Sequence, residues 1–259
     1  MSQLLVDDEN RELLHDVQRY WTTRAAGYSQ LNAAELANAK RAAWLKKINE
    51  YAPDKPVLKV LDIGSGPGFF AVALALAGHQ VTAVDITQAM LDQARGNAAR
   101  YGAEINFVLS DVHSLPFADN RFDLIVTRNV TWNLDDPQCA YAEWHRVLAA
   151  GGRLINFDAN WYLQLFDEQS HLGYLQDRAN ARYLGLDDHY VDTDTAAMEN
   201  IARQLPLSRE RRPQWDTQAL LKCGYRKIAL DTRVGDELWD ETEKVNYAST
   251  PMFLICAEK

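Results

Sequence analysis

The sequence is poor in cysteine and has no long hydrophobic run. Its 259 residues include three scattered cysteines, Cys139, Cys223 and Cys256, which form neither a CxxC pair nor the even number of a disulfide framework. We expect each to be a small, buried residue in a reducing compartment. No apolar run approaches the ~18 residues that cross a bilayer, and the N-terminus lacks the basic and apolar blocks of a signal peptide. These absences predict a soluble, cytoplasmic protein with no membrane partner.

Basic residues are also in short supply. Lys and Arg total 27 against 36 Asp and Glu, so the formal net charge is −9. Tight, sequence-independent binding to nucleic acid depends on basic residues that displace counterions, so we expect no nucleic-acid partner. The sequence has no HExxH, His-x-His or cysteine cluster, and we expect no metal. With 47% hydrophobic residues, the chain can bury one sizeable core, which predicts a single domain over 1–259. The sequence does not distinguish a monomer from a homodimer.

Hydrophobic patterning predicts an α/β fold. Apolar residues at helical spacing within 10–50 indicate two helices. From Val57 onward, short β-branched runs alternate with segments of helix length, which is typical of a parallel sheet with crossover helices. We expect Gly151 and Gly152 to stop the last of these helices. The expected strands are 57–63, 80–85, 105–109, 122–127 and 153–157, and the expected helices between them are 69–77, 87–101 and 137–149.

The alternation breaks after Asp158. Segment 159–213 follows a strand directly, at the carboxyl edge where open α/β sheets bind ligands, so we interpret it as a helical cap insertion. A helix at 217–223 and strands at 226–234 and 252–257 then complete the sheet. The predicted organisation is an N-terminal helical segment (1–52), a ligand-binding core (53–158), the cap (159–213) and the C-terminal end of the sheet (214–259).

The strongest motif is the run VLDIGSGPG at 60–68, an apolar strand that ends in a glycine-rich turn. Asp85 ends the next strand, 21 residues after Gly64, where a carboxylate can accept both hydroxyls of a ribose. The spacing is GxGxG, whereas a dinucleotide fingerprint would need its third glycine at Phe69. The charge of Asp62 would repel a pyrophosphate but suits the ammonium and sulfonium groups of S-adenosylmethionine.

From about Val57 to Asp158 the sequence resembles the class I S-adenosylmethionine-dependent methyltransferases, in particular their small-molecule subgroup, which is methyltransferase-11-like. The resemblance implies a Rossmann-like, doubly wound, seven-stranded sheet with an antiparallel last strand, and S-adenosyl-L-methionine as cofactor. It implies that the glycine turn wraps the methionine part of this donor, that Asp85 holds the ribose, and that a Ser-Asp-Val motif meets the adenine edge. The donor residues implied in this way are Asp62, Gly64, Ser65, Gly66, Gly68, Asp85, Ile86, Met90, Ser110, Asp111 and Val112.

Each of the other candidate binding residues could instead have a purely structural role. Tyr20 and Tyr28 belong to an aromatic cluster that either approaches the donor carboxylate or packs in the core. Arg128 and Asn129 follow the fourth strand, in the turn that the resemblance places beneath the donor. Arg128 would either grip a carboxylate with its forked guanidinium or form a surface ion pair. Asp62 could also simply cap the glycine turn.

The sequence contains fewer motifs that indicate where the methyl acceptor binds. Trp132, Asn133, Trp161 and Tyr162 lie just beyond the fourth and fifth strands, where they would either line an acceptor pocket or pack under the cap. No motif singles out a general base, so the catalytic residues stay unassigned. The histidines available by chemistry are His113, His145, His171 and His189.

The predicted function is transfer of a methyl group from S-adenosylmethionine to a small-molecule acceptor, at an O, N, S or C atom that the sequence does not identify. Asn129-Val-Thr-Trp stands where amino methylases of nucleic-acid bases have Asn-Pro-Pro-Tyr, which argues against that reaction. The alternatives are a tRNA nucleoside methyltransferase and a donor-binding protein without turnover. A nicotinamide oxidoreductase is a more distant one.

Overall fold

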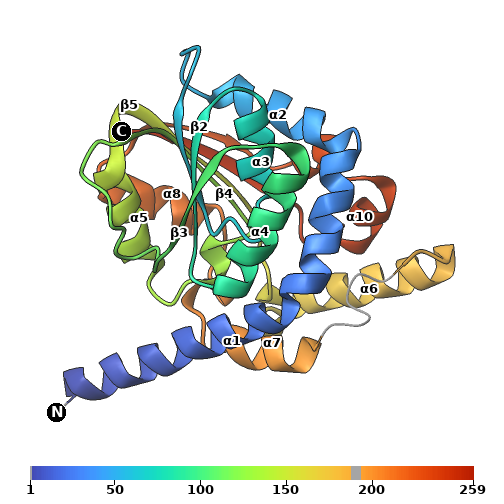
Figure 1. The fold of residues 1–259 in the computed structure, drawn as a ribbon. Helices are drawn as coiled ribbons and strands as arrows, with labels where there is room; N and C mark the ends of the chain where they lie inside the picture. Colours follow the sequence, from blue (N-terminus) through green and yellow to red (C-terminus); the bar gives the residue numbers. More distant parts are fainter. Residues whose placement is uncertain (1, 188–193) are drawn as a thin grey trace.

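A seven-stranded sheet forms the centre of the molecule (Figure 1). The computed structural model describes residues 2–187 and 194–259, with side chains from residue 12 onward. The strand order is β3-β2-β1-β4-β5-β7-β6, and β7 runs antiparallel to both of its neighbours. This topology confirms the predicted doubly wound sheet with an antiparallel last strand. The strands are β1 (Lys59–Ile63), β2 (Gln80–Asp85), β3 (Ile105–Leu109), β4 (Phe122–Arg128), β5 (Leu148–Asp158), β6 (Arg226–Asp231) and β7 (Phe253–Glu258).

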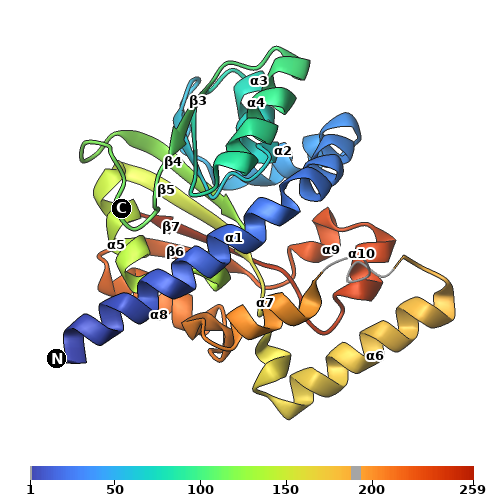
Figure 2. The same cartoon turned by 60° about the horizontal axis from the view of Figure 1, so that its bottom comes forward.

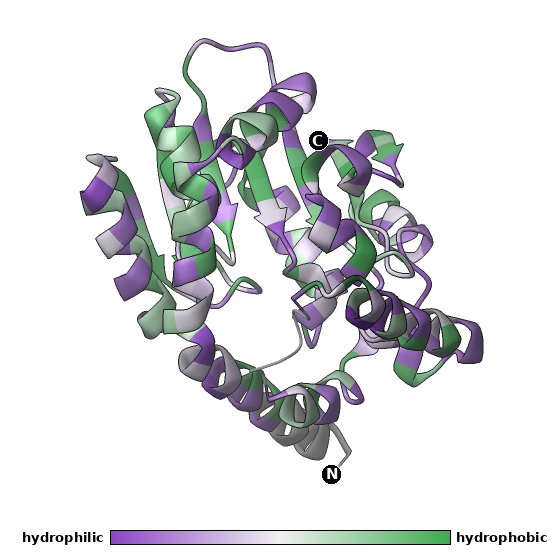
Figure 3. Cartoon of the chain, turned by 90° about the vertical axis from the view of Figure 1, so that its right-hand side faces the viewer, coloured by the Kyte–Doolittle hydropathy of each residue, from purple (hydrophilic) through white to green (hydrophobic). Residues whose placement is uncertain are grey.

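Helices cover both faces of this sheet, so the central strands are largely apolar (Figure 3). Trp44, Phe70 and Phe157 meet edge-on or tilted in the core on one face. Tyr141 and Trp144 are fully buried on the other face. The helices described are α1 (Ser2–Ala37), α2 (Lys40–Tyr51), α3 (Phe69–Leu76), α4 (Gln88–Tyr101), α5 (Pro137–Val147), α6 (Glu168–Leu184), α7 (Thr195–Ala202), α8 (Gln214–Lys222), α9 (Gly235–Leu238) and α10 (Glu241–Asn246).

The junction between α5 and β5 differs from the prediction. Gly151 and Gly152 do not stop the helix, because α5 ends at Val147 and β5 already begins at Leu148, which pairs with Phe122 of β4. Both glycines lie inside the strand. A Cβ on Gly152 would lie 2.8 Å from the Ala149 carbonyl oxygen, so glycine is needed for close backbone approach.

Helix α1 is 36 residues long and crosses the carboxyl edge of the sheet (Figure 2). The Gln18 side chain donates a hydrogen bond to the Ile86 carbonyl (2.9 Å), just after β2. Further along, Ser29 accepts a bond from Asn97 of α4 (3.3 Å). These contacts fix α1 beside the ends of the strands.

The segment predicted as a cap supplies helices α6 and α7. Met198 and Ile201 of α7 pack with Leu13 and Val17 of α1 in a small separate core, so α7 supports α1 from outside. Figure 2 shows α6 extending away from the sheet. Helix α7 therefore lies behind α1, whereas the C-terminal end of the segment reaches the end of β5.

The sequence pattern did not predict the two short helices α9 and α10, which lie outside the sheet.

All three cysteines are free, but only Cys256 is buried. Cys139 is exposed, which contradicts the expectation, because it faces outward on the first turn of α5. Among the described residues, no helix combines the length and apolar character needed to span a membrane.

Candidate functional site

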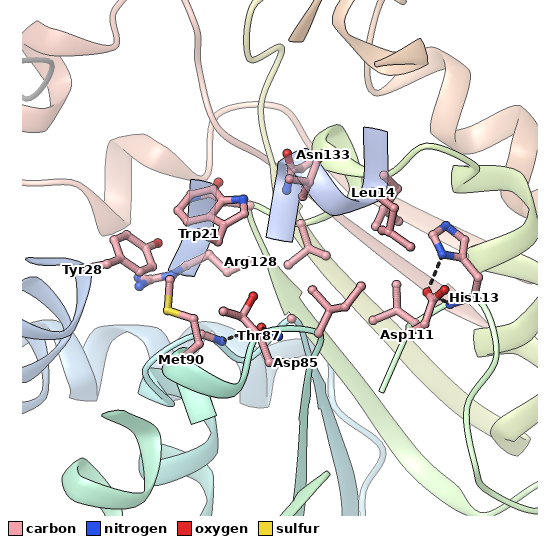
Figure 4. A pocket seen from close by; sticks show the side chains of 18 residues that line it. Leu14, Trp21, Tyr28, Asp85, Thr87, Met90, Asp111, His113, Arg128 and Asn133 are labelled. Atoms are coloured by element: carbon pink, nitrogen blue, oxygen red, sulfur yellow. Dashed lines mark hydrogen bonds and ion pairs between the residues drawn. The ribbon is translucent and has the colours of Figure 1, made fainter. Parts of the chain in front are cut away.

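A cavity opens at the carboxyl edge of the sheet, under α1 (Figure 4). The space between its lining residues, open mouth included, is about 730 Å³. Its walls come from α1, the β1–α3 turn, the ends of β2 and β3, and the turn after β4. Elements far apart in sequence therefore converge on one space.

The glycine turn forms the floor of this cavity. Gly64, Gly66 and Gly68 have φ angles of 60°, 52° and 88°, a region that side chains with a Cβ rarely adopt. A Cβ on Gly64 would come within 2.5 Å of a methyl carbon of Val130. The turn therefore needs glycine both for its backbone conformation and for the close approach of the loop after β4.

Asp62 lies in the wall of a smaller adjoining pocket of about 300 Å³. Its carboxylate is buried, and its Oδ2 atom has no hydrogen-bond partner among the described residues. Burial raises the pKa of Asp62 to about 8. Ser65 Oγ is likewise buried without a partner, so this pocket holds two unsatisfied polar atoms that a cationic, hydrogen-bonding ligand would satisfy.

Asp85 connects the end of β2 to the glycine turn. Its carboxylate accepts hydrogen bonds from the backbone N–H groups of Gly66 (2.9 Å) and Thr87 (2.8 Å), one on each oxygen. Burial raises the pKa of Asp85, and these two bonds oppose the rise. Since each carboxylate oxygen can accept a further bond, Asp85 can hold the turn and also bind hydroxyls in the cavity that it lines.

Asp111 and His113 form a pair at the far end of the cavity. His113 Nδ1 lies 2.6 Å from Asp111 Oδ1, and the His113 backbone N–H donates to the same oxygen. Burial lowers the pKa of His113, but the hydrogen bond and charge of Asp111, with Asp135, outweigh it and raise the pKa. Asp111 and Val112 line the cavity, whereas Ser110 does not. The Ser110 hydroxyl donates instead to nearby backbone carbonyls.

Arg128 is engaged with a side chain of α1. Its guanidinium donates to both oxygens of Glu35, at 3.3 and 2.9 Å. It also lies over the rings of Trp44 and Phe69, 5.0 and 4.7 Å from their centroids. The forked grip on a carboxylate that the sequence suggested thus exists, but within this structure the carboxylate belongs to Glu35.

The turn after β4 brings two amides, Asn129 and Asn133, to the cavity. Asn129 adopts a left-handed conformation with φ of 58°, which asparagine tolerates better than most residues. The Asn129 side chain accepts a hydrogen bond from Trp161 Nε1 (3.2 Å). Asn133 Oδ1 is buried and has no hydrogen-bond partner in the described structure.

A buried ionic network supports this turn from behind. Arg212, whose side chain is 0% exposed, donates to Asp158 (2.8 Å) and to Asp216 (2.7 Å). Asp158 Oδ2 also accepts the Trp132 backbone N–H (3.0 Å), and Thr131 bonds both Asp158 and Arg212. The end of the 159–213 segment therefore fixes the turn that faces the cavity.

Several predicted residues lie outside the cavity lining. Trp132 is 5% exposed and packs in the small core between α1 and α7, with Tyr20, Trp161 and Tyr162 against it. The Trp132 and Tyr162 rings lie 5.2 Å apart. These positions fit the packing alternative, whereas Tyr28, Asn129 and Asn133 do line the cavity.

Sequence reasoning missed the contribution of α1 to the lining. Leu14, Val17 and Trp21 face the cavity at spacings of three and four residues. That spacing signals a helix face but gives no indication of what the face meets. Other lining residues that it did not assign are Thr87, Val130 and Leu134.

The remaining histidines lie away from the lining. His145 packs against Tyr225, with ring centroids 4.9 Å apart, and His171 is exposed on α6. His189 lies outside the described residues. Among the described histidines, His113 is therefore the one that lines this cavity.

Comparison with solved structures identifies the fold. The phosphoethanolamine N-methyltransferase 2 of Haemonchus contortus, solved with S-adenosylhomocysteine, superimposes with a TM-score of 0.57 at 16% identity, covering 83% of this chain and 52% of that one. The [4+2]-cyclase SpnF superimposes with a TM-score of 0.56 at 17% identity, covering 85% and 80%. The chain therefore has the fold of the class I methyltransferases.

The sequence comparison is more specific. Residues 61–156 match the family model described as a methyltransferase domain, which confirms the resemblance seen in the motifs. The demethylmenaquinone methyltransferase of Bacteroides fragilis is 32% identical over 143 residues, which are 54% of this chain and 58% of that protein. The chain spans little more than half the length of the curated relatives it matches. Residues 61–156 thus form a methyltransferase domain.

Proposed function

We propose that the chain transfers the methyl group of S-adenosylmethionine to a small-molecule acceptor. The observation that carries this proposal is Asp62, a buried carboxylate beside the glycine turn with one unsatisfied oxygen. Burial raises the pKa of this carboxyl group, and an ammonium group on a ligand would favour its ionised form, whereas a pyrophosphate would be repelled by that form. The donor fits this requirement, because its methionine end carries an ammonium.

Each of the two pockets would bind a different part of the donor. Asp62 and Ser65 would bind the ammonium end, and Tyr28 and Arg128 lie in the same small pocket, suited to the donor carboxylate. Asp85 would accept the ribose hydroxyls. The residues left for the adenine are Ile86, Met90, Asp111 and Val112, which line the larger cavity together.

When bound, the donor supplies a methyl group on a positively charged sulfur, which leaves with its electron pair as the neutral thioether of S-adenosylhomocysteine. The chain contributes by excluding water and by aligning the acceptor. Helix α1 covers the cavity, and the turn at 129–133 is fixed by buried bonds before any ligand arrives. Such fixed geometry and desolvation lower the barrier of a displacement without an obligatory base.

The relatives support a small acceptor. The relative from Bacteroides fragilis is named as a demethylmenaquinone methyltransferase, but the matched region covers only 58% of that protein. We therefore propose the class of acceptor, a small molecule, and leave its identity to experiment.

The proposal is tested by following radiolabel from methyl-labelled donor into acceptors. We expect label in the small-molecule fraction of a cell extract with the wild-type protein and, at donor concentrations near the wild-type Kd, much less with Asp85→Asn. Label in added tRNA instead would replace the small-molecule acceptor with a nucleoside. Tight donor binding with no labelled product from any fraction would contradict catalysis.

A further inference from the structure

Arg128 lies between the cavity under α1 and the smaller adjoining pocket, and it lines both of them. Of the described residues around the smaller pocket, it is the one that carries a permanent positive charge. Figure 4 shows its side chain reaching from the end of β4 towards Tyr28 of α1. A carboxylate that enters the smaller pocket would therefore have Arg128 as its counterion.

The guanidinium of Arg128 needs an anion in this position. Its side chain is only 13% exposed. It lies over three aromatic rings, those of Trp44, Phe69 and Phe70, with centroids at 5.0, 4.7 and 5.5 Å. These rings attract a cation but accept no conventional hydrogen bond from it. A charge that is largely removed from water is costly unless an anion pairs with it.

Glu35 supplies that anion in this structure. Arg128 donates to both of its carboxylate oxygens, at 3.3 and 2.9 Å, and the Glu35 side chain is 16% exposed. Tyr28, Asn32 and Glu35 follow one another at spacings of four and three residues, so they share one face of α1. Tyr28 and Asn32 line the smaller pocket. Helix α1 therefore brings its own carboxylate to the arginine at the edge of that pocket.

The methionine end of the donor carries a second carboxylate for the same guanidinium. Glu35 already occupies both terminal nitrogens of Arg128, and this bidentate geometry is available to only one carboxylate at a time. Two carboxylates on one guanidinium would also repel each other, and Asp62 in the same pocket adds to the acidic surroundings. The donor carboxylate can therefore gain the full contact with Arg128 only when Glu35 gives it up.

We propose that Glu35 is an internal competitor of the donor, which holds Arg128 through the contact that the donor carboxylate takes over on binding. This inference rests on the proposed function, because it assumes that S-adenosylmethionine binds with its methionine end in the smaller pocket. The product S-adenosylhomocysteine keeps the same carboxylate, so the return of Glu35 to Arg128 also favours product release. Glu35 thus sets how tightly the chain holds donor and product.

The carboxylate of the ligand makes the test specific. S-adenosylhomocysteine and its decarboxylated analogue, which differ only in that group, are titrated calorimetrically at pH 7 into the wild type and Glu35→Gln. We expect Glu35→Gln to bind S-adenosylhomocysteine about 10-fold more tightly, because the competing charge is gone, and to bind the analogue no more tightly than the wild type does.

Three results would overturn the inference. Unchanged affinity for S-adenosylhomocysteine would mean that Glu35 and the ligand carboxylate act independently. Weaker binding would make Glu35 a residue that positions Arg128 for the donor. Equal tightening of both ligands would mean that the effect does not depend on the carboxylate.

Glu12→Gln is the matched control, because it removes the same charge from an exposed position near the start of α1. We expect it to bind both ligands as the wild type does. A gain in Glu12→Gln equal to that in Glu35→Gln would assign the effect to the net charge of the chain and would contradict competition at Arg128.

A measurement on the wild type covers the case in which Glu35→Gln disturbs α1. Coupling between two sites is reciprocal, so the ligand carboxylate should in turn weaken the hold of Glu35 on Arg128. Amide hydrogen exchange at residues 33–39 should therefore be faster in the complex with S-adenosylhomocysteine than in the complex with its decarboxylated analogue. Equal or slower exchange would overturn the inference.

The wild-type titration separates this inference from the proposed function. If S-adenosylhomocysteine does not bind to the wild type, the proposed function itself fails. If it binds with micromolar affinity and Glu35→Gln leaves that affinity unchanged, only the competition by Glu35 is wrong.

Discussion

Asp62 is the residue on which the proposed donor site depends most, because it is an acidic group buried without a full set of hydrogen-bond partners. Its pKa of about 8 means that most molecules carry it protonated at pH 7. A donor ammonium would favour the ionised form, so binding should release about one proton per donor at pH 7. Calorimetry of S-adenosylhomocysteine binding in buffers of different ionisation enthalpy measures this number directly.

The variant Asp62→Asn removes the titrating group. We expect its proton release to fall to zero and its donor affinity to lose the rise with pH that the wild type shows up to about pH 8. Proton release that is unchanged in Asp62→Asn would assign the titration to another group.

The same pKa shift makes a prediction about stability. Because the folded-state pKa of Asp62 is raised, the folded chain binds more protons than the unfolded chain between about pH 4 and pH 8. The free energy of unfolding of the ligand-free protein should therefore decrease across that window through this residue. Asp62→Asn should flatten that decrease in urea titrations, and an equal slope in both proteins would contradict the buried position of the group.

Replacing Asp85 should weaken donor binding while leaving the fold largely intact. Asp85→Asn keeps one acceptor oxygen for the backbone but removes charge-assisted bonds to the ribose, which predicts about 100-fold weaker S-adenosylhomocysteine binding, on the order of 2–3 kcal/mol. Asp92→Asn, on the exposed face of α4, is the matched control and should bind as the wild type does. Wild-type affinity in Asp85→Asn would argue against ribose binding at this position.

The glycine turn and Asp85 could be predicted from sequence because their chemistry is local. Each lies at the end of an apolar strand, and parallel strands bring their carboxyl ends to one edge. Leu14 and Asn133 depend on how a distant helix and a turn come together. The position of Trp132 beyond β4 left an acceptor pocket and packing equally open in the sequence, and the structure buries this residue between α1 and α7.

At the scale of elements, the turn after β4 is held by a network that no local motif indicates. Arg212 lies 54 residues after Asp158 and 81 after Thr131 in the chain. Each of these three residues is at most 3% exposed. Breaking a buried ion pair by removing one partner leaves an uncompensated charge. The network therefore couples the stability of the fold to the geometry of the site.

Arg212→Met should lower the free energy of unfolding by about 3–5 kcal/mol, because Asp158 and Asp216 would be left buried without their cation. Equilibrium unfolding in urea measures the change. The neighbouring Arg211→Ala removes an ion pair from a side chain that is 71% exposed and should cost no more than about 1 kcal/mol. Similar losses in the two variants would contradict the structural role of the network.

Helix α1 is the element whose place the sequence left open. Its apolar positions predicted a helix, but its position across the edge of the sheet depends on contacts with Ile86, Asn97 and Arg128, each more than 65 residues away. The pairing of Glu35 with Arg128 joins α1 to the end of β4. The helix that covers the cavity is thus tied directly to the strand that precedes the turn at 129–133.

At the scale of the whole molecule, the fold sets the location of the site and leaves its chemistry to individual side chains. The same fold occurs in a phosphoethanolamine N-methyltransferase and in the [4+2]-cyclase SpnF, so topology alone does not determine the reaction. The alternation of short apolar strands with helices predicted the seven-stranded sheet correctly. The start of β5 was predicted wrongly, because Gly151 and Gly152 lie inside a strand with a register shift and do not end a helix. The account therefore rests on the pocket formed around the glycine turn.

The most direct test of the central claim is isothermal titration of the folded chain, shown to be free of co-purified ligand, with S-adenosylmethionine and S-adenosylhomocysteine. The account predicts one binding site per chain with micromolar or tighter affinity for both compounds, and no displacement by NADH. No binding of either compound, or displacement by NADH, would contradict it.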